Sequence, residues 1–164
     1  MTLALFLKFL HIMASFWLIT GILGRHVALS KAEQSKDIRT TCTLLPVASV
    51  FENGMVRPSS TAVLLAGLAT AWAQGWPILG FLQGGASNWL LVSLLLTLSF
   101  IPVVALVFIP RGKIFEQRLN EAIAKDQVTP ELTAAFNDPA VQAARRYEIA
   151  ALVVIIFLMV VKPF

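Results

Sequence analysis

The chain has 164 residues, of which 57% are hydrophobic and 13% charged, and its formal net charge is +4. Soluble domains are typically about 45–50% apolar and about 25% charged, so this composition excludes an ordinary soluble protein, a disordered chain and a collagen-like repeat. The one cysteine excludes a disulfide framework within the chain. A mean hydropathy of +0.78 then indicates a small integral membrane protein.

Four apolar stretches follow one another along the chain, at about residues 3–24, 59–76, 88–110 and 146–162. A helix needs roughly 20 mostly apolar residues to cross a membrane, and each stretch comes close to this length. None has the period-two alternation of a membrane β-strand, and backbone inside lipid must satisfy its own hydrogen bonds. The sequence therefore predicts an all-α fold with a single integral membrane domain over residues 1–164, a four-helix transmembrane bundle.

The connections between these spans also carry helix signals. In the third connection, apolar residues recur at helical spacing, at Phe115, Leu119 and Ile123. Thr129 and Asp138 each stand directly before a proline, which is typical of an N-cap followed by the first turn of a helix. We expect the third span to continue beyond the membrane, with a bend at residues 110–112, and the last helix to begin near residue 139.

Basic residues gather in two of the connections. Of the 13 lysines and arginines, all but Lys8 and Lys162 lie in the first and third connections. Short loops rich in Lys and Arg stay in the cytoplasm, so both termini should lie outside, with helical extensions in the cytoplasm. The positive charge then suits anionic lipid of the inner leaflet and not nucleic acid.

Charged residues should pair with one another at the inner ends of the helices. Arg25 and His26 follow the first span, Glu52 and Arg57 precede the second, and Glu148 enters the last. Charges at helix ends near headgroups need only water and each other. We therefore expect an ion-pair network at the inner rim of the bundle.

His11 is the candidate cofactor-binding residue, because an ionisable side chain within a span suggests a function. Lys8 and Ser15 share its helix face, at offsets of three and four. Histidine can ligate haem or copper, or hydrogen-bond a quinone oxygen. Met159 lies at a similar depth and could complete a His/Met metal site. The alternative is a neutral histidine bonded to a backbone carbonyl or a serine of a neighbouring helix.

A stripe of alanines marks one face of the second span, at Ala62, Ala66, Ala69 and Ala73. Small residues allow close helix approach in lipid, so this stripe should be a packing seam, within the bundle, against another membrane subunit or against a second copy of the chain. The sequence contains no nucleotide-binding, hydrolase or metalloprotease motif. These features favour a non-catalytic accessory or scaffold subunit of a membrane complex. The alternative is a redox-linked membrane protein that binds haem, quinone or copper through His11.

Several short motifs resemble a known family. They are Lys8-Phe9-Leu10-His11, Arg57-Pro58-Ser59, Gly75-Trp76-Pro77, Ile109-Pro110 and the ending Met159-Val160-Val161-Lys162-Pro163. Together they resemble the DUF2269 family of predicted integral membrane proteins over nearly the whole chain, which implies a multi-pass protein of the bacterial inner membrane. The first helix is more distantly similar to the copper-resistance D and membrane protoporphyrinogen oxidase families. In the latter family the histidine of the first helix is associated with haem b, so that similarity implies haem b at His11, the one position that matches.

Overall fold

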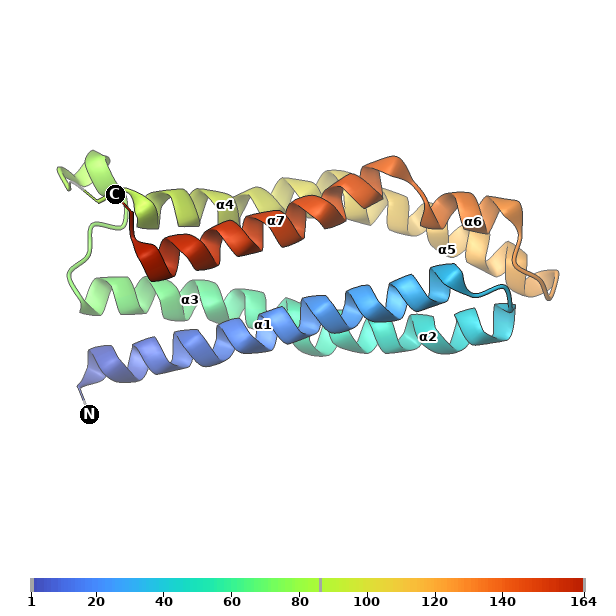
Figure 1. Cartoon of the computed structure of the whole chain (residues 1–164), viewed down its shortest axis with the longest axis horizontal. Helices are drawn as coiled ribbons and strands as arrows, with labels where there is room; N and C mark the ends of the chain where they lie inside the picture. The colour runs from blue at the N-terminus through green and yellow to red at the C-terminus, as the bar shows by residue number, and fades with distance from the viewer. Residues whose placement is uncertain (1, 86, 164) are drawn as a thin grey trace. The chain divides into compact units, whose positions relative to one another are not determined.

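The computed structural model describes residues 2–85 and 87–163, and within these ranges it is helical without strands. The chain divides into two compact units, Met1–Trp76 and Pro77–Phe164. Each unit is built from long helices that run side by side in opposite directions (Figure 1).

The first unit is a helical hairpin. Helix α1 (Leu3–Gln34) is followed by α2 (Ile38–Phe51), the π-helical segment η1 (Glu52–Val56) and α3 (Arg57–Ala73). The last three continue without a break, so that one long helix returns along α1 (Figure 1). The helix α1 extends ten residues beyond the predicted span of 3–24. Polar residues in this extension do not suit lipid but are compatible with a helix in water.

Helix α2 lies in what the sequence indicated as a connection, and its start is set by a local cap. The Asp37 carboxylate accepts hydrogen bonds from the backbone N–H groups of Arg39 and Thr40, at 3.3 and 2.9 Å. The Thr40 hydroxyl also donates to it, at 2.7 Å. These bonds, first the Thr40 hydroxyl and then its N–H, hold the pKa of Asp37 below its usual value. Capping of this kind stabilises the first turn of the helix.

Small residues allow α1 to approach the returning helix closely. Ala14, Gly21 and Ala28 recur every seven residues on α1, and all three are buried, as expected for a face packed along a second helix. A Cβ at Gly21 would lie 2.8 Å from the Cβ of Met55. The packing therefore depends on the absence of side chains at specific positions of α1.

The second unit begins with a short 3₁₀ turn and contains a second helical hairpin. Its elements are η2 (Gly80–Gln83), α4 (Trp89–Val103), the π-helical η3 (Val104–Phe108), α5 (Ile109–Ala124), α6 (Pro130–Phe136) and α7 (Pro139–Val161). The elements α4, η3 and α5 form one continuous helix, and α7 returns beside α4 (Figure 1). The predicted caps are confirmed, since Thr129 Oγ1 accepts from the Leu132 N–H and Asp138 Oδ1 accepts from the Ala140 N–H.

The two continuous helices, α2–η1–α3 and α4–η3–α5, each change from α-type to π-type backbone hydrogen bonding just before a proline. In η1 and η3, the residue that precedes Pro58 or Pro110 donates its N–H to a carbonyl five residues back, and these donors are Arg57 and Ile109. Proline lacks an N–H, and its ring clashes with the carbonyl four residues back. A π segment relieves that clash while the helix continues. The register change lies immediately before residues 110–112, where a bend is predicted, and π-bulges are a recognised site of helix kinks.

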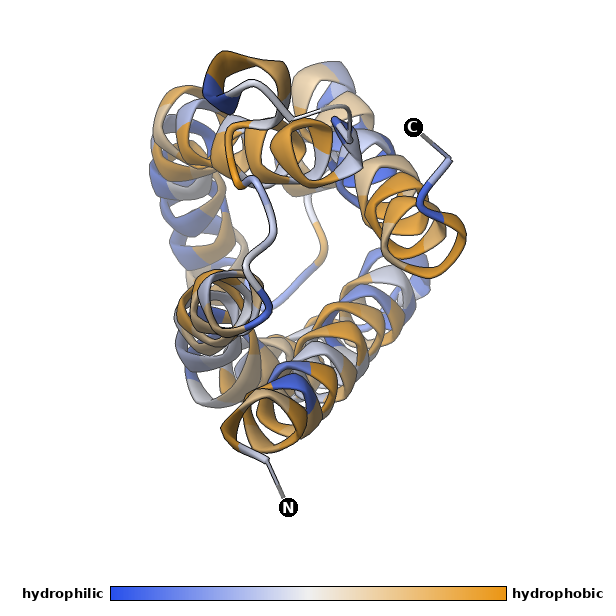
Figure 2. Cartoon of the chain, turned by 90° about the vertical axis from the view of Figure 1, so that its left-hand side faces the viewer, coloured by the Kyte–Doolittle hydropathy of each residue, from blue (hydrophilic) through white to orange (hydrophobic). Residues whose placement is uncertain are grey.

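Two of these helices are long and apolar enough to cross a membrane, Leu3–Gln34 and the continuous helix Trp89–Ala124. Hydrophobic residues dominate the turns of α1 and α7 nearest the viewer in Figure 2. The predicted second and fourth spans, 59–76 and 146–162, overlap the helices α3 and α7, which end at Ala73 and Val161. A bundle of four membrane-spanning helices and its orientation remain predictions.

Candidate functional site

His11 connects α1 to α3 within the first unit. Its Nδ1 lies 3.0 Å from the carbonyl oxygen of Val63. Because a carbonyl can only accept, Nδ1 must carry the proton of this hydrogen bond. The imidazole ring lies against Gly67, where an added Cβ would be 2.9 Å from Cε1 and 3.1 Å from Nδ1. This is the arrangement expected for a histidine bonded to the backbone of a neighbouring helix.

The hydrogen bond from Nδ1 also orients the other ring nitrogen. In a neutral imidazole with a proton on Nδ1, Nε2 holds the free lone pair. Ser15 does not share this role, because its hydroxyl donates to the main-chain carbonyl of His11 at 2.7 Å. Lys8 lies one turn before His11 and is exposed. Of the three predicted cofactor-binding residues, His11 bonds to α3 through its ring, Ser15 bonds to the main chain of α1, and Lys8 is exposed.

Met159, the predicted second metal ligand, lies on α7 of the second unit and is half-buried. A site that combines it with His11 would join the two units and remains a prediction. Among residues 2–85 and 87–163, no group of three or more His, Cys, Asp or Glu side chains could hold a metal ion.

The alanine stripe of α3, which consists of Ala62, Ala66, Ala69 and Ala73, lies beside the contact with α1. All four residues are half-buried. The α3 residues that meet His11 are Val63 and Gly67, each one residue further along the helix. One residue corresponds to a rotation of about 100° around a helix with 3.6 residues per turn. The contact with His11 is therefore made beside the predicted stripe, and the role of the stripe as a packing seam remains a prediction.

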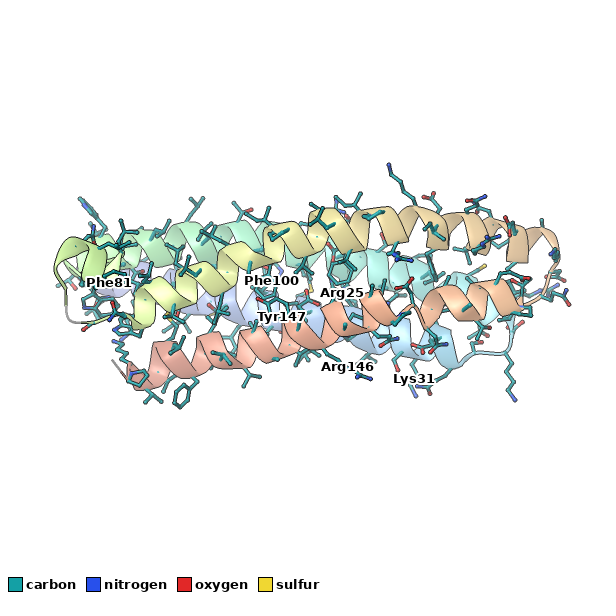
Figure 3. All side chains as sticks on the ribbon, turned by 90° about the horizontal axis from the view of Figure 1, so that it is seen from above. Arg25, Lys31, Phe81, Phe100, Arg146 and Tyr147 are labelled. Carbon is teal, nitrogen blue, oxygen red and sulfur yellow. The ribbon has the colours of Figure 1, made fainter. Side chains whose placement is uncertain are left out.

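A cluster of charges joins α1 to the π segment of the first unit, as predicted from the sequence. Arg25 Nη1 lies 2.6 Å from Glu52 Oε2, and Arg57 Nε lies 3.4 Å from Glu52 Oε1. The Arg25 side chain is 14% exposed and that of Arg57 is 71% exposed. Figure 3 labels Arg25 on α1. The partly buried Arg25–Glu52 pair fixes the point where the π segment begins against α1.

The second unit has a polar contact that the sequence analysis missed. The hydroxyls of Ser99 on α4 and Tyr147 on α7 are hydrogen-bonded. The Tyr147 ring also lies beside Phe100, with ring centroids 5.9 Å apart (Figure 3). Glu148, the next residue, is buried. The signal available was that Tyr147 is the one tyrosine of the chain and stands in a predicted membrane helix.

Comparison with known proteins identifies a family. A family model described as "Predicted integral membrane protein (DUF2269)" matches residues 5–163, which includes both units. No curated protein and no solved structure matches the chain. The match agrees with the resemblance that the sequence motifs indicated and with the two apolar helices long enough to cross a membrane.

Proposed function

Because this chain belongs to the DUF2269 family of predicted integral membrane proteins, we propose that it is a small non-catalytic subunit that assembles with other membrane proteins. We place it in the bacterial inner membrane as a multi-pass protein, with its basic connections against the anionic inner leaflet. The observation that carries the proposal is the position of the alanine stripe on α3. The four alanines are half-buried, whereas His11 of α1 meets α3 at the neighbouring positions Val63 and Gly67.

The physical argument concerns what drives helices together in lipid. Burial of apolar area contributes little there, because lipid tails are as apolar as leucine, so helices associate where small residues permit close backbone contact. The contact of α1 with the returning helix already uses this principle, at Gly21 against η1 and at Gly67 of α3 against His11. The alanines present a second surface of the same kind. Leu65, by contrast, is 62% exposed on α3 and suits contact with lipid tails.

The test compares a bulky substitution in the stripe with the same change outside it. Ala66→Phe should release the copurifying subunits from the tagged chain in native lipid particles, whereas Leu65→Phe should retain them. The measurement is the mass of the purified particle and the identity of its protein bands. If the wild-type particle contains this chain alone, or if Ala66→Phe keeps the same partners, the proposal is wrong.

A second candidate function follows from the ring of His11. The bond between Nδ1 and Val63 leaves Nε2 available and fixes the ring plane, as backbone carbonyls do for metal-ligating histidines. The residue could therefore ligate haem or copper, with Met159 as a second ligand, or bond a quinone oxygen. The visible spectrum and metal content of the wild type and of His11→Ala test this. A Soret band or bound copper lost in the variant would support it, and a colourless, metal-free wild type would exclude haem and copper.

A further inference from the structure

The connection between α3 and α4 is a folded loop. Six backbone N–H groups between residues 79 and 85 donate hydrogen bonds within it. Two of these bonds use amide side chains: the Leu79 N–H donates to Gln83 Oε1 at 3.1 Å, and the Phe81 N–H donates to Asn88 Oδ1 at 2.9 Å. The other four close tight turns, such as that from the Gly85 N–H to the Gly80 carbonyl at 3.1 Å. The loop therefore satisfies much of its backbone without water.

Glycine is required where the loop turns back on itself. Gly80 is buried at φ +54°, and a Cβ there would lie 2.5 Å from Asn88 Oδ1. Gly84 ends the 3₁₀ turn at φ +72°. Both values lie in the left-handed region that favours glycine. The amide of Asn88 and the backbone of Gly80 thus form one compact unit that holds residues 79–85 in a single shape.

The side chains that this loop presents are apolar. Phe81 is 64% exposed and Leu82 is 65% exposed, and Leu79 beside them is 41% exposed; Figure 3 labels Phe81 on the loop. The segment 77–88 contains no charged residue. A loop in water normally leaves its backbone to the solvent and carries polar side chains. This loop differs on both points, because its backbone N–H groups bond within the loop and its exposed side chains are apolar.

We propose that residues 78–85 form an interfacial anchor that immerses Leu79, Phe81 and Leu82 in the lipid where α4 enters the membrane. Immersion demands that backbone groups be satisfied internally, as six N–H groups between residues 79 and 85 are. The level of the interface is marked independently by Trp89, the first residue of α4, whose ring lies 5.2 Å from the Lys162 ammonium. Tryptophan is enriched at membrane–water interfaces, where long lysine side chains also extend to the headgroups.

The test measures the surroundings of single nitroxide labels in vesicles of phosphatidylcholine and phosphatidylglycerol. In a Cys42→Ala background, Phe81→Cys and Leu82→Cys are labelled separately, and Glu116→Cys, at an exposed position on α5, serves as the control. At the two loop positions, collisions with oxygen should exceed those with a water-soluble nickel complex, and at Glu116 the order should be reversed. The two loop positions are independent, so failure of one variant to fold leaves the other as the test.

Two other results would overturn the proposal. If nickel reaches the loop labels as freely as it reaches position 116, the loop lies in water. If neither oxygen nor nickel reaches them, a protein partner or a second copy of the chain covers the loop. As a check on the folded shape, Asn88→Ala should increase the mobility of the label at position 82, because the bond to the Phe81 N–H is lost.

Discussion

Replacement of Gly67 by alanine should loosen the contact between α1 and α3. The new Cβ would lie 2.9 Å from His11 Cε1 and 3.1 Å from Nδ1, so the ring must move and its 3.0 Å bond to Val63 must lengthen. Loss of the bond costs about 1 kcal/mol and overpacking about 1–3 kcal/mol, whereas the higher helix propensity of alanine returns about 1 kcal/mol. We expect a net loss of about 1–3 kcal/mol in the free energy of unfolding.

Reversible unfolding in mixed micelles, followed by circular dichroism, measures this loss. Gly112→Ala is the matched control, because a Cβ placed there would meet no atom within 4 Å beyond its chain neighbours and the backbone of its own helix, and it should leave stability unchanged or slightly raised. In a His11→Ala background, Gly67→Ala should lose most of its cost, since the two residues are in direct contact. The reasoning is refuted if the two glycine variants are equally stable, or if the cost of Gly67→Ala persists without the imidazole.

Three further predictions follow from the polar contacts. Arg25→Ala should lower the free energy of unfolding by about 1–3 kcal/mol, a value between those of exposed and of buried salt bridges. The pair lies between these cases because the Arg25 side chain is 14% exposed and that of Glu52 is 30% exposed. Equal stability of the variant and the wild type in the same micelle assay would contradict this. The hydrogen bonds from Thr40 lower the pKa of Asp37, so the cap of α2 should be intact at neutral pH and weaken as the pH falls through that lowered pKa. Amide exchange at the start of α2 should show this acid dependence in the wild type and not in Asp37→Asn. Tyr147→Phe removes the hydroxyl bond to α4 and should cost about 0.6 kcal/mol, as measured for hydrogen bonds between membrane helices; a loss of several kcal/mol would indicate a larger polar network.

Sequence signals that involve only neighbouring residues, such as an N-cap followed by a proline, correctly predicted where two helices begin. The pairs Thr129-Pro130 and Asp138-Pro139 located the starts of α6 and α7, because a cap and a first-turn proline act within one turn. Helix α2 was missed because it carries Pro46 in its interior, which weighs against a helix when local preference alone is considered. Its packing against α1 overrides that preference.

Contacts between distant residues were predicted only where charge indicated a partner. The pairing of Glu52 with Arg25 and Arg57 was expected because opposite charges at helix ends attract one another. The contact between His11 and Gly67 depends on the rotation of two helices about their axes, which hydropathy does not specify. The alanine stripe was recognised as a small-residue face, but hydropathy did not indicate that His11 meets α3 at Val63 and Gly67; what packs on the stripe remains a prediction.

The most direct test of the proposed function is photo-crosslinking in living cells from a diazirine-bearing side chain at position 66 of α3, with the same group at position 65 as the control. Position 66 lies in the alanine stripe, and Leu65 is 62% exposed beside it. A subunit role predicts a discrete protein adduct from position 66 and only lipid adducts from position 65. Lipid adducts alone from both positions, or the same protein adduct from both, would contradict the proposal that the alanine stripe binds a partner subunit.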